Sequence, residues 1–214
     1  MAKTNRTINE LLDNLNQELS WRRRELNFIK DKISKDVSEA QKSLIRACVT
    51  MLYAHWEGFV KNVTEAYLNF VSLRRLTHKQ LKPCFVAITM RKKFDLMKSN
   101  YFENQVNAIE FLLNELDRRA SIPYRDIINT KSNLNFGILK DICCVIGIDY
   151  SKYSLKKVFI DEKLLKNRNN IAHGNYLAID LDEFEDIYRT TLNLMESIRD
   201  DILVAAEKEQ YKKG

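Results

Sequence analysis

Glycine and proline are scarce in this chain of 214 residues, which holds 5 Gly and 2 Pro. A β-sandwich or β-barrel of this size needs many tight turns, and tight turns draw on both residue types. Their scarcity argues against a β-rich fold and favours a few long helices joined by short loops. We therefore predict an all-α bundle with long antiparallel helices.

Long apolar runs are also missing. The N-terminal residues lead directly into an amphipathic pattern, without the apolar core of a signal peptide. No stretch approaches the roughly 20 apolar residues that a membrane helix needs. We expect a cytoplasmic protein that has no membrane partner.

The residue patterns of metal and cofactor sites are absent as well. No C-x-x-C pair occurs, and no Cys stands at zinc-ligand spacing from a His. There is no glycine-rich phosphate loop, no G-x-S-x-G motif and no paired metal-binding carboxylates. We expect neither metal nor cofactor, and we interpret the four cysteines as reduced, buried thiols: Cys48, Cys84, Cys143 and Cys144.

The composition that remains is that of a globular protein, with 45% hydrophobic and 30% charged residues. The formal net charge is +6. A modest excess of positive charge suits an anionic partner such as a nucleic acid.

Two long helices are predicted in the first third of the chain. The first covers about residues 8–33, and its Arg22-Arg23-Arg24 run is interpreted as a solvated face. The second covers about residues 38–73 and has the strongest 3.6-residue apolar period. That period is formed by Leu44, Cys48, Met51, Leu52, Trp56, Phe59, Val60, Val63, Tyr67, Phe70 and Val71.

Shorter helices are predicted in the middle of the chain. One follows Pro83, with Phe85, Ile88, Phe94 and Met97 facing inward. Another covers about residues 103–119 and is built on Val106, Ile109, Leu112, Leu113 and Leu116.

Capping residues predict the remaining boundaries. A polar, irregular segment at 121–133 leads to a helix that begins at Asn135 and ends at Gly147. After a loop at 149–157, Asp161 is predicted to cap a helix that ends at His173, and Asp180 to cap the last helix. His78 is expected in a solvated loop.

No internal repeat, low-complexity tract or linker divides the chain. We predict one helical domain over residues 1–214. Within it, about 1–37 form an N-terminal helix or arm, about 38–206 form the core, and 207–214 form a frayed tail.

The segment Leu164–Gly174 carries the chemistry. Leu164 and Ile171 are two helical turns apart and share an apolar face. Arg168 stands between them and leans toward the packed side. Because an unpaired buried charge is costly, Arg168 there needs an anionic partner or a cleft.

His173 follows Arg168 by five residues, which is about 140° around an ideal helix. One helix therefore does not easily direct both side chains at one atom. Fraying at Gly174, or a second copy of the helix across a two-fold axis, resolves this. A His near neutrality suits proton transfer, and an Arg suits a phosphate.

The run Arg168-Asn169-Asn170-Ile171-Ala172-His173 resembles the R-x4-6-H signature of the HEPN superfamily (higher eukaryotes and prokaryotes nucleotide-binding domain). A polar residue often follows the Arg in that signature, and Asn169 matches. The stretch 54–61 and the short helix that closes at 146–149 also resemble small stand-alone prokaryotic HEPN proteins.

The resemblance implies a metal-independent endoribonuclease that works as a homodimer with a composite site. In that scheme the substrate 2′-hydroxyl attacks the adjacent phosphate, His173 handles the proton, Arg168 binds the phosphate and Asn169 orients one of them. Such proteins are similar to toxins and anti-phage effectors with a cognate antitoxin or adjacent-gene partner. HEPN toxins that a nucleotidyltransferase silences have Tyr two residues after the His, where this chain has Asn175.

Other residues are expected to support this site. Candidates for a supporting shell are His55, Glu57, Asn170 and Tyr176, although His55 also fits a hydrogen-bonded core histidine. Candidates for contacts with RNA phosphates are Lys156, Lys157, Lys166 and Arg91, which also fit an ordinary charged surface.

Two other interpretations stay open. The chain is a non-catalytic HEPN module that binds RNA or a partner protein, with Arg168 and His173 holding a helix end. Alternatively, it is the regulatory subunit of a two-gene defence system.

Overall fold

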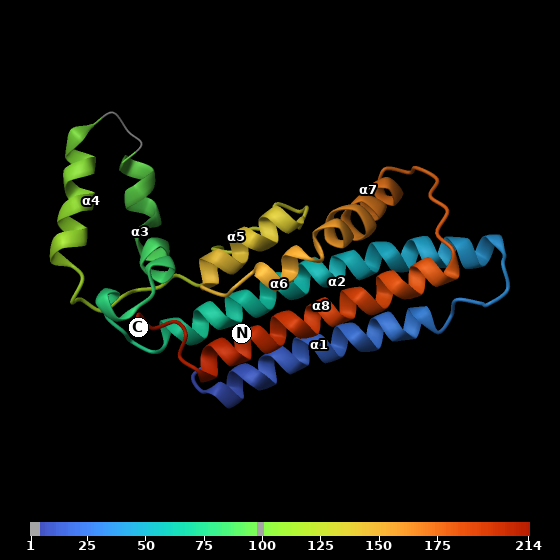
Figure 1. The fold of residues 1–214 in the computed structure, drawn as a ribbon, viewed down its shortest axis with the longest axis horizontal. Coiled ribbons are helices and arrows are strands. Elements are labelled where there is room, and N and C mark those ends of the chain that lie inside the picture. Colours follow the sequence, from blue (N-terminus) through green and yellow to red (C-terminus); the bar gives the residue numbers. More distant parts are fainter. Residues whose placement is uncertain (1–4, 98–100) are drawn as a thin grey trace.

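The computed structural model describes residues 5–97 and 101–214, and these residues form helices and loops without a named strand. Three long helices lie side by side as a bundle: α1 (Ile8–Lys30), α2 (Glu39–Ser72) and α8 (Leu181–Glu207) (Figure 1). The prediction of an all-α bundle with long helices is confirmed.

The core of the bundle forms around α2, whose apolar side chains pack against both α1 and α8. Trp56, Phe59 and Val60 have no exposed surface. The ends of the three helices are set by side-chain caps, as Thr7, Ser38 and Asp180 each accept a hydrogen bond from the first turn. The start of the last helix at Asp180 is thereby confirmed.

A second layer covers another face of α2 (Figure 1). It consists of α5 (Phe136–Ile146), α6 (Ser151–Ser154), the π-helix η2 (Phe159–Leu165) and α7 (Lys166–Ala172). The predicted limits of α5 are confirmed, because the Asn135 side chain accepts from the Ile138 N–H and Gly147 adopts φ 69°.

Asp161 does not cap a helix of its own, so that prediction is wrong. It lies inside η2, and its carboxylate accepts a hydrogen bond of 2.7 Å from the Phe136 N–H. Asp161 therefore helps to cap α5, 25 residues earlier in the chain. The segment predicted as a loop at 149–157 also contains α6.

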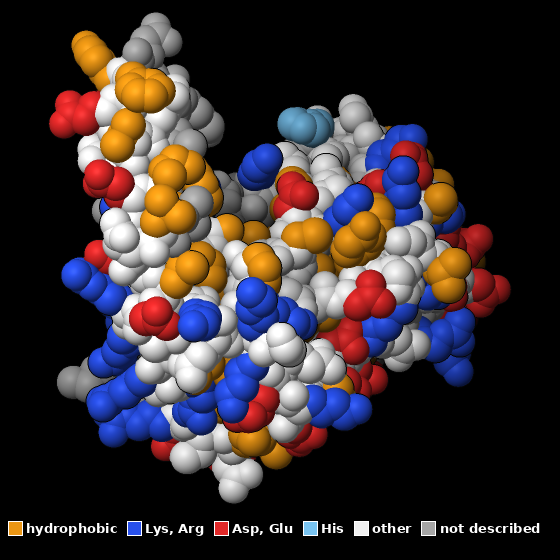
Figure 2. All heavy atoms as spheres, turned by 60° about the vertical axis from the view of Figure 1, so that its left-hand side comes forward, with side chains coloured by type: hydrophobic (Ala, Val, Ile, Leu, Met, Phe, Trp, Pro, Cys, Tyr) orange, Lys and Arg blue, Asp and Glu red, His pale blue; other side chains and the backbone are white. Residues whose placement is uncertain are grey.

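The helices α3 (Pro83–Met97) and α4 (Phe102–Asn114) form a hairpin arm at one end of the bundle (Figure 1). Phe94 of α3 was expected to face inward, but it is 39% exposed, so that prediction is wrong. The side chains of Met97 and Leu112 lie outside the described part. The α4 helix is shorter than predicted, and its apolar side chains gather on the surface in Figure 2: Val106, Ile109 and Leu113, with Leu116 beyond its end.

The C-terminal residues are packed, contrary to the frayed tail expected for 207–214. Tyr211 is buried against Phe70, with 6.1 Å between the ring centroids. Its carbonyl accepts from the Lys82 N–H at 2.9 Å, and Lys213 donates to the Gln80 carbonyl at 2.8 Å. The tail is thus tied to the segment that follows α2.

Two polar residues expected in solvent are buried. His78 lies in the 3-10 helix η1 (His78–Gln80). Its Nδ1 is 3.0 Å from the Glu115 carbonyl oxygen. Arg22 on α1 is 4% exposed and pairs with Glu18 at 3.1 Å. The Arg22 guanidinium lies close to Gly58 of α2, where a Cβ would stand 3.2 Å from Nη2.

Candidate active site around Arg168 and His173

Arg168 lies on α7 and is directed toward the segment that precedes α5. Its Nη2 donates a hydrogen bond of 2.8 Å to the Ser132 carbonyl oxygen and lies 3.5 Å from the Asn133 Oδ1. The side chain is 19% exposed. Because a guanidinium keeps its charge, these oxygen contacts partly replace the water that the site excludes.

Tyr53 of α2 forms the surface beneath this guanidinium. The Arg168 Cζ lies 4.1 Å from the centroid of the Tyr53 ring, within the range of a cation–π interaction. The phenolic oxygen accepts from the Leu134 N–H at 2.5 Å. Burial raises the pKa of Tyr53 to about 12, so the phenol stays neutral beside Arg168.

Glu57 stands one helical turn after Tyr53, on the same side of α2. Its Oε2 lies 4.0 Å from the Arg168 Nη2, and the Glu57 side chain is 18% exposed. The structure therefore brings Glu57 to Arg168, as expected for a supporting residue. Sequence reasoning missed Tyr53, although its spacing of four residues from Glu57 is the signal that identifies it.

The π-helix before α7 contributes to this orientation. Over η2 the chain makes a wider turn than an α-helix, which changes the side-chain register before Arg168. Ile160 and Leu164 are fully buried and anchor the segment to the core. The register change and these anchors turn Arg168 toward α2 and the segment before α5.

His173 occupies the C-cap of α7 and is exposed. Its N–H donates to the Asn169 carbonyl at 3.0 Å, and Gly174 follows with φ 78°, which ends the helix. Among the residues that the structure describes, no hydrogen bond or ion pair joins the side chains of Arg168 and His173. In a single chain, Arg168 is held and His173 is open to a partner or substrate.

The comparisons with known proteins identify this chain by its family. A family model described as RiboL-PSP-HEPN matches residues 17–204, which include α2 to α7, most of α1 and α8, and the segment from Arg168 to His173. The chain belongs to this HEPN family. Comparison with curated proteins gave no match, and comparison with solved structures gave none either.

Membership of the HEPN family points to a role as a ribonuclease or in RNA binding, and HEPN domains often bind RNA or dimerise. The match includes both helices that form the Arg168 environment, because α2 and α7 lie within 17–204. The family match therefore extends the resemblance from the short Arg168–His173 motif to most of the chain.

Five of the remaining site candidates lie on α7 or shortly before it in the chain. Asn169 and Asn170 are half-buried on α7 itself. Lys156 and Lys157 are exposed just before η2, while Lys166 pairs with Glu162 at 2.7 Å. Lys156 and Lys157 thus precede η2 in the chain, and Lys166 lies two residues before Arg168.

His55, Tyr176 and Arg91 are directed elsewhere. The His55 Nε2 lies 3.0 Å from the Glu25 Oε2, under the edge of Trp21 on α1. Tyr176 stacks on Arg46 near the start of α2, with 5.2 Å to the ring centroid. Arg91 lies on α3 in the arm. None of the three has a described contact with Arg168.

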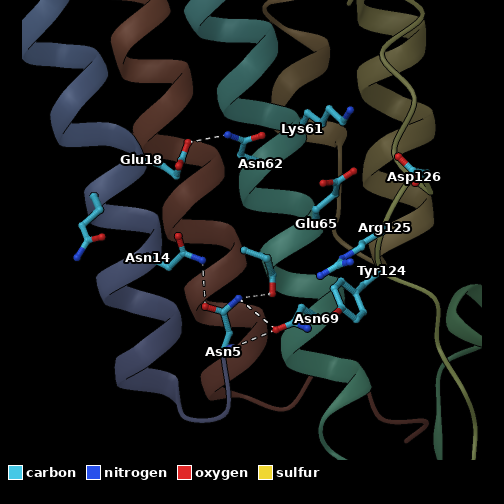
Figure 3. A pocket seen from close by; sticks show the side chains of 12 residues that line it. Asn5, Asn14, Glu18, Lys61, Asn62, Glu65, Asn69, Tyr124, Arg125 and Asp126 are labelled. Carbon is cyan, nitrogen blue, oxygen red and sulfur yellow. Dashed lines mark hydrogen bonds between the residues drawn. The ribbon is translucent and has the colours of Figure 1, made fainter. Parts of the chain in front are cut away.

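A polar pocket of about 590 Å³ lies between α1, α2 and the segment 124–126 (Figure 3). Its amides bond to one another, since Asn14 donates to Asn5 at 3.0 Å and Asn5 donates its main-chain N–H to Asn69 at 3.0 Å. These hydrogen bonds hold the start of α1 against the end of α2. Because Arg168 and His173 are not among its lining residues, we assign this pocket no part in the candidate chemistry.

The part of the chain that the structure describes offers neither a metal cluster nor a membrane-spanning helix. No group of three or more His, Cys, Asp or Glu side chains is arranged to hold a metal ion. Within the same described residues, no helix has the length and apolarity required to cross a membrane.

Proposed function

We propose that this HEPN protein is a metal-independent endoribonuclease with Arg168 and His173 as catalytic residues. The observation that carries the proposal is the arrangement around α7. Tyr53, Glu57 and the Ser132 carbonyl hold the Arg168 guanidinium in place, while His173 stands exposed at the end of the same helix. A fixed cation and an exposed imidazole that are brought to one groove are suited to phosphoryl transfer.

In the proposed reaction the substrate 2′-hydroxyl attacks the adjacent phosphate. His173 accepts the hydroxyl proton or donates a proton to the leaving 5′-oxygen, and Arg168 stabilises the added negative charge on the phosphate. Asn169 orients one of these two groups. The products are a 2′,3′-cyclic phosphate and a 5′-hydroxyl, and the chemistry needs no metal. Lys156, Lys157 and Lys166 contact the RNA backbone.

The active form is a homodimer with a composite site. The lack of a described contact between Arg168 and His173 within one chain supports this, as does the exposure of His173. Across a two-fold axis, two Arg168 and two His173 side chains surround one groove. We propose that the protein is a toxin or anti-phage effector controlled by an antitoxin or adjacent-gene partner.

Mixing two inactive variants tests the composite site. In a heterodimer of Arg168→Gln and His173→Ala, the shared groove keeps one native Arg168 and one native His173 from opposite copies, so the heterodimer recovers about half the wild-type rate. Equal amounts refolded together give about half heterodimer, so the mixture recovers about a quarter of that rate. Refolding the two variants together and measuring cleavage of transfer RNA gives the result. No recovery in a heterodimer shown to have formed would place both residues in one chain's site.

The non-catalytic alternative rests on one observation. Arg168 already has oxygen partners from Ser132 and Glu57, which is the environment of a residue that anchors a helix. In that case wild type binds RNA without cleaving it, and His173→Ala binds RNA equally well. Electrophoretic mobility of RNA with each protein, followed over hours, separates binding from turnover.

A further inference from the structure

A groove of about 430 Å³ separates the arm helix α3 from α5 and the segment 127–131. On the side shown in Figure 2, the surface is hollowed between the arm and the rest of the molecule. The walls are mainly apolar, and they include Ile88 of α3, Ile127 of the segment, and Ile142 and Val145 of α5. This volume and lining are typical of sites for small ligands.

The charged groups of the groove lie away from the point where α3 meets α5. The first turn of α3 adjoins the end of α5, because a Cβ on Gly147 would stand 3.0 Å from the Cys84 Sγ. Arg91 is seven residues further along α3, which corresponds to about 10 Å. Lys131 lies shortly before α5, and Asp141 is in its first half.

These cations are available to a ligand. Arg91 and Lys131 are exposed, and neither side chain has a hydrogen bond or ion pair among the described residues. Asp141 is also exposed and offsets one of the two positive charges. An apolar channel whose charged lining residues carry a net positive charge is complementary to a molecule with an apolar chain and one negative head.

We propose that this groove binds a small anionic amphiphile, a carboxylate with an unbranched alkyl chain. The carboxylate contacts Arg91 and Lys131, and the chain extends between α3 and α5 toward Cys84 and Cys144. Arg91 is thereby assigned to this ligand rather than to RNA. The binding itself does not depend on the proposed ribonuclease function.

The segment that lines the groove also holds Arg168. Lys131 and Ser132 follow one another with φ 53° and 54°, a left-handed conformation that is strained for non-glycine residues. The Lys131 side chain lines the groove, and the next residue supplies the carbonyl that accepts from Arg168. A ligand on Lys131 therefore changes the position of the Arg168 anchor, which makes the groove a regulatory site. This step rests on the proposed function.

Fluorescence of dansyl-labelled undecanoic acid with the full chain, and its displacement by decanoate, tests the binding. Loss of one charge-assisted contact in Arg91→Gln lowers the affinity about tenfold. Asp141→Asn raises the affinity, because it removes the opposing charge. Lys140→Gln is the matched control, since Lys140 lies on α5 over Tyr150 and not in the groove, and its affinity stays at the wild-type value.

Arg91→Gln lowers the affinity and Asp141→Asn raises it. These opposite changes distinguish a specific binding site from general adsorption to an apolar surface. No saturable binding by wild type, or equal affinities in Arg91→Gln, Asp141→Asn and wild type, would overturn the proposal. Displacement by decanol as effective as displacement by decanoate would also overturn the role of the charged end. Ala87→Trp, at an exposed position of α3 that lines the groove, abolishes binding without requiring a change in the core.

The readout is ligand fluorescence, so it is independent of RNA cleavage. If wild type binds the probe but cleaves no RNA, the ligand site stands and the ribonuclease proposal fails. If it cleaves RNA but binds no probe, the reverse holds. With both activities present, the regulatory step predicts that saturating decanoate changes the cleavage rate of wild type but not that of Ala87→Trp. An unchanged wild-type rate contradicts it.

Discussion

Local sequence predicts the burial of Arg168 but not the residues that it contacts. The spacing from Leu164 and to Ile171 predicted that it leans toward the packed side, and the structure has it 19% exposed. Its partners were not predictable in the same way. Ser132 is 36 residues away in the chain, and Tyr53 comes from another helix, so only the tertiary packing brings them to the guanidinium.

His55 gives a pH-dependent prediction at the same scale. Burial lowers the pKa of His55, although Glu25 opposes the shift and Arg22 adds to it. The unfolded chain therefore binds the proton more tightly than the folded one, and stability falls as pH drops through about 6.5 toward the folded value. Urea unfolding at about pH 7.5 and about pH 5.5 measures this loss.

His55→Gln is the control for that measurement, because glutamine retains a donor for Glu25 but does not titrate. We expect the variant to lose less stability than wild type over the same pH interval. An equal loss in both proteins would assign the pH dependence to other groups.

At the scale of elements, the helix limits set by caps were predictable from local sequence. Asn135 and Gly147 lie directly at the two ends of α5, and each interacts with residues at most four positions away. Asp161 was not predictable, because it caps α5 from 25 residues away. The exposed face of α4 was missed for a related reason, since apolar periodicity shows which residues share a face but not whether another element covers it.

Replacing Asp161 tests its role in capping α5. Asp161→Ala leaves the Phe136 N–H without its acceptor, and we expect the free energy of unfolding to fall by about 1 kcal/mol. Glu162→Ala, which breaks an exposed pair with Lys166, changes it by less than about 0.5 kcal/mol. Chemical denaturation of both variants gives the comparison. Equal effects would remove Asp161 from the cap.

The α4 face gives a prediction about the position of the core. Leu113 is 73% exposed, so Leu113→Gln alters the free energy of unfolding by no more than about 0.5 kcal/mol. Leu139 on α5 is 1% exposed, and Leu139→Ala costs about 3 kcal/mol. A large loss for Leu113→Gln would mean that another surface covers α4 in solution.

At the scale of the molecule, the layers around α2 connect parts of the chain that the sequence keeps apart. The amphipathic pattern of α2 predicted a buried helix, and α2 contacts α1, α8 and the α5–α7 layer. The packed tail was not predictable, because the sequence from Lys208 to Gly214 is polar apart from one tyrosine. Burial of that tyrosine depends on a surface formed by the end of α2.

The tail therefore contributes to stability. Tyr211→Ala removes a side chain that is 2% exposed, and we expect a loss of about 3 kcal/mol in the free energy of unfolding. Gln210→Ala, at the exposed neighbouring position, serves as the matched control and changes little. Thermal and urea unfolding both report the difference. Similar stabilities for the two variants would show that the tail is dispensable.

RNA cleavage in EDTA is the most direct test of the central claim, the assignment of ribonuclease chemistry to Arg168 and His173. Purified wild type and His173→Ala are each incubated with total RNA and with transfer RNA, and the product ends are identified. Since His173 is exposed and has no described side-chain partner, its replacement leaves the fold intact. We predict that wild type cleaves and leaves 2′,3′-cyclic phosphate ends, while His173→Ala does not cleave. Intact RNA with a folded, dimeric wild-type protein, or equal cleavage by both proteins, would contradict the assignment.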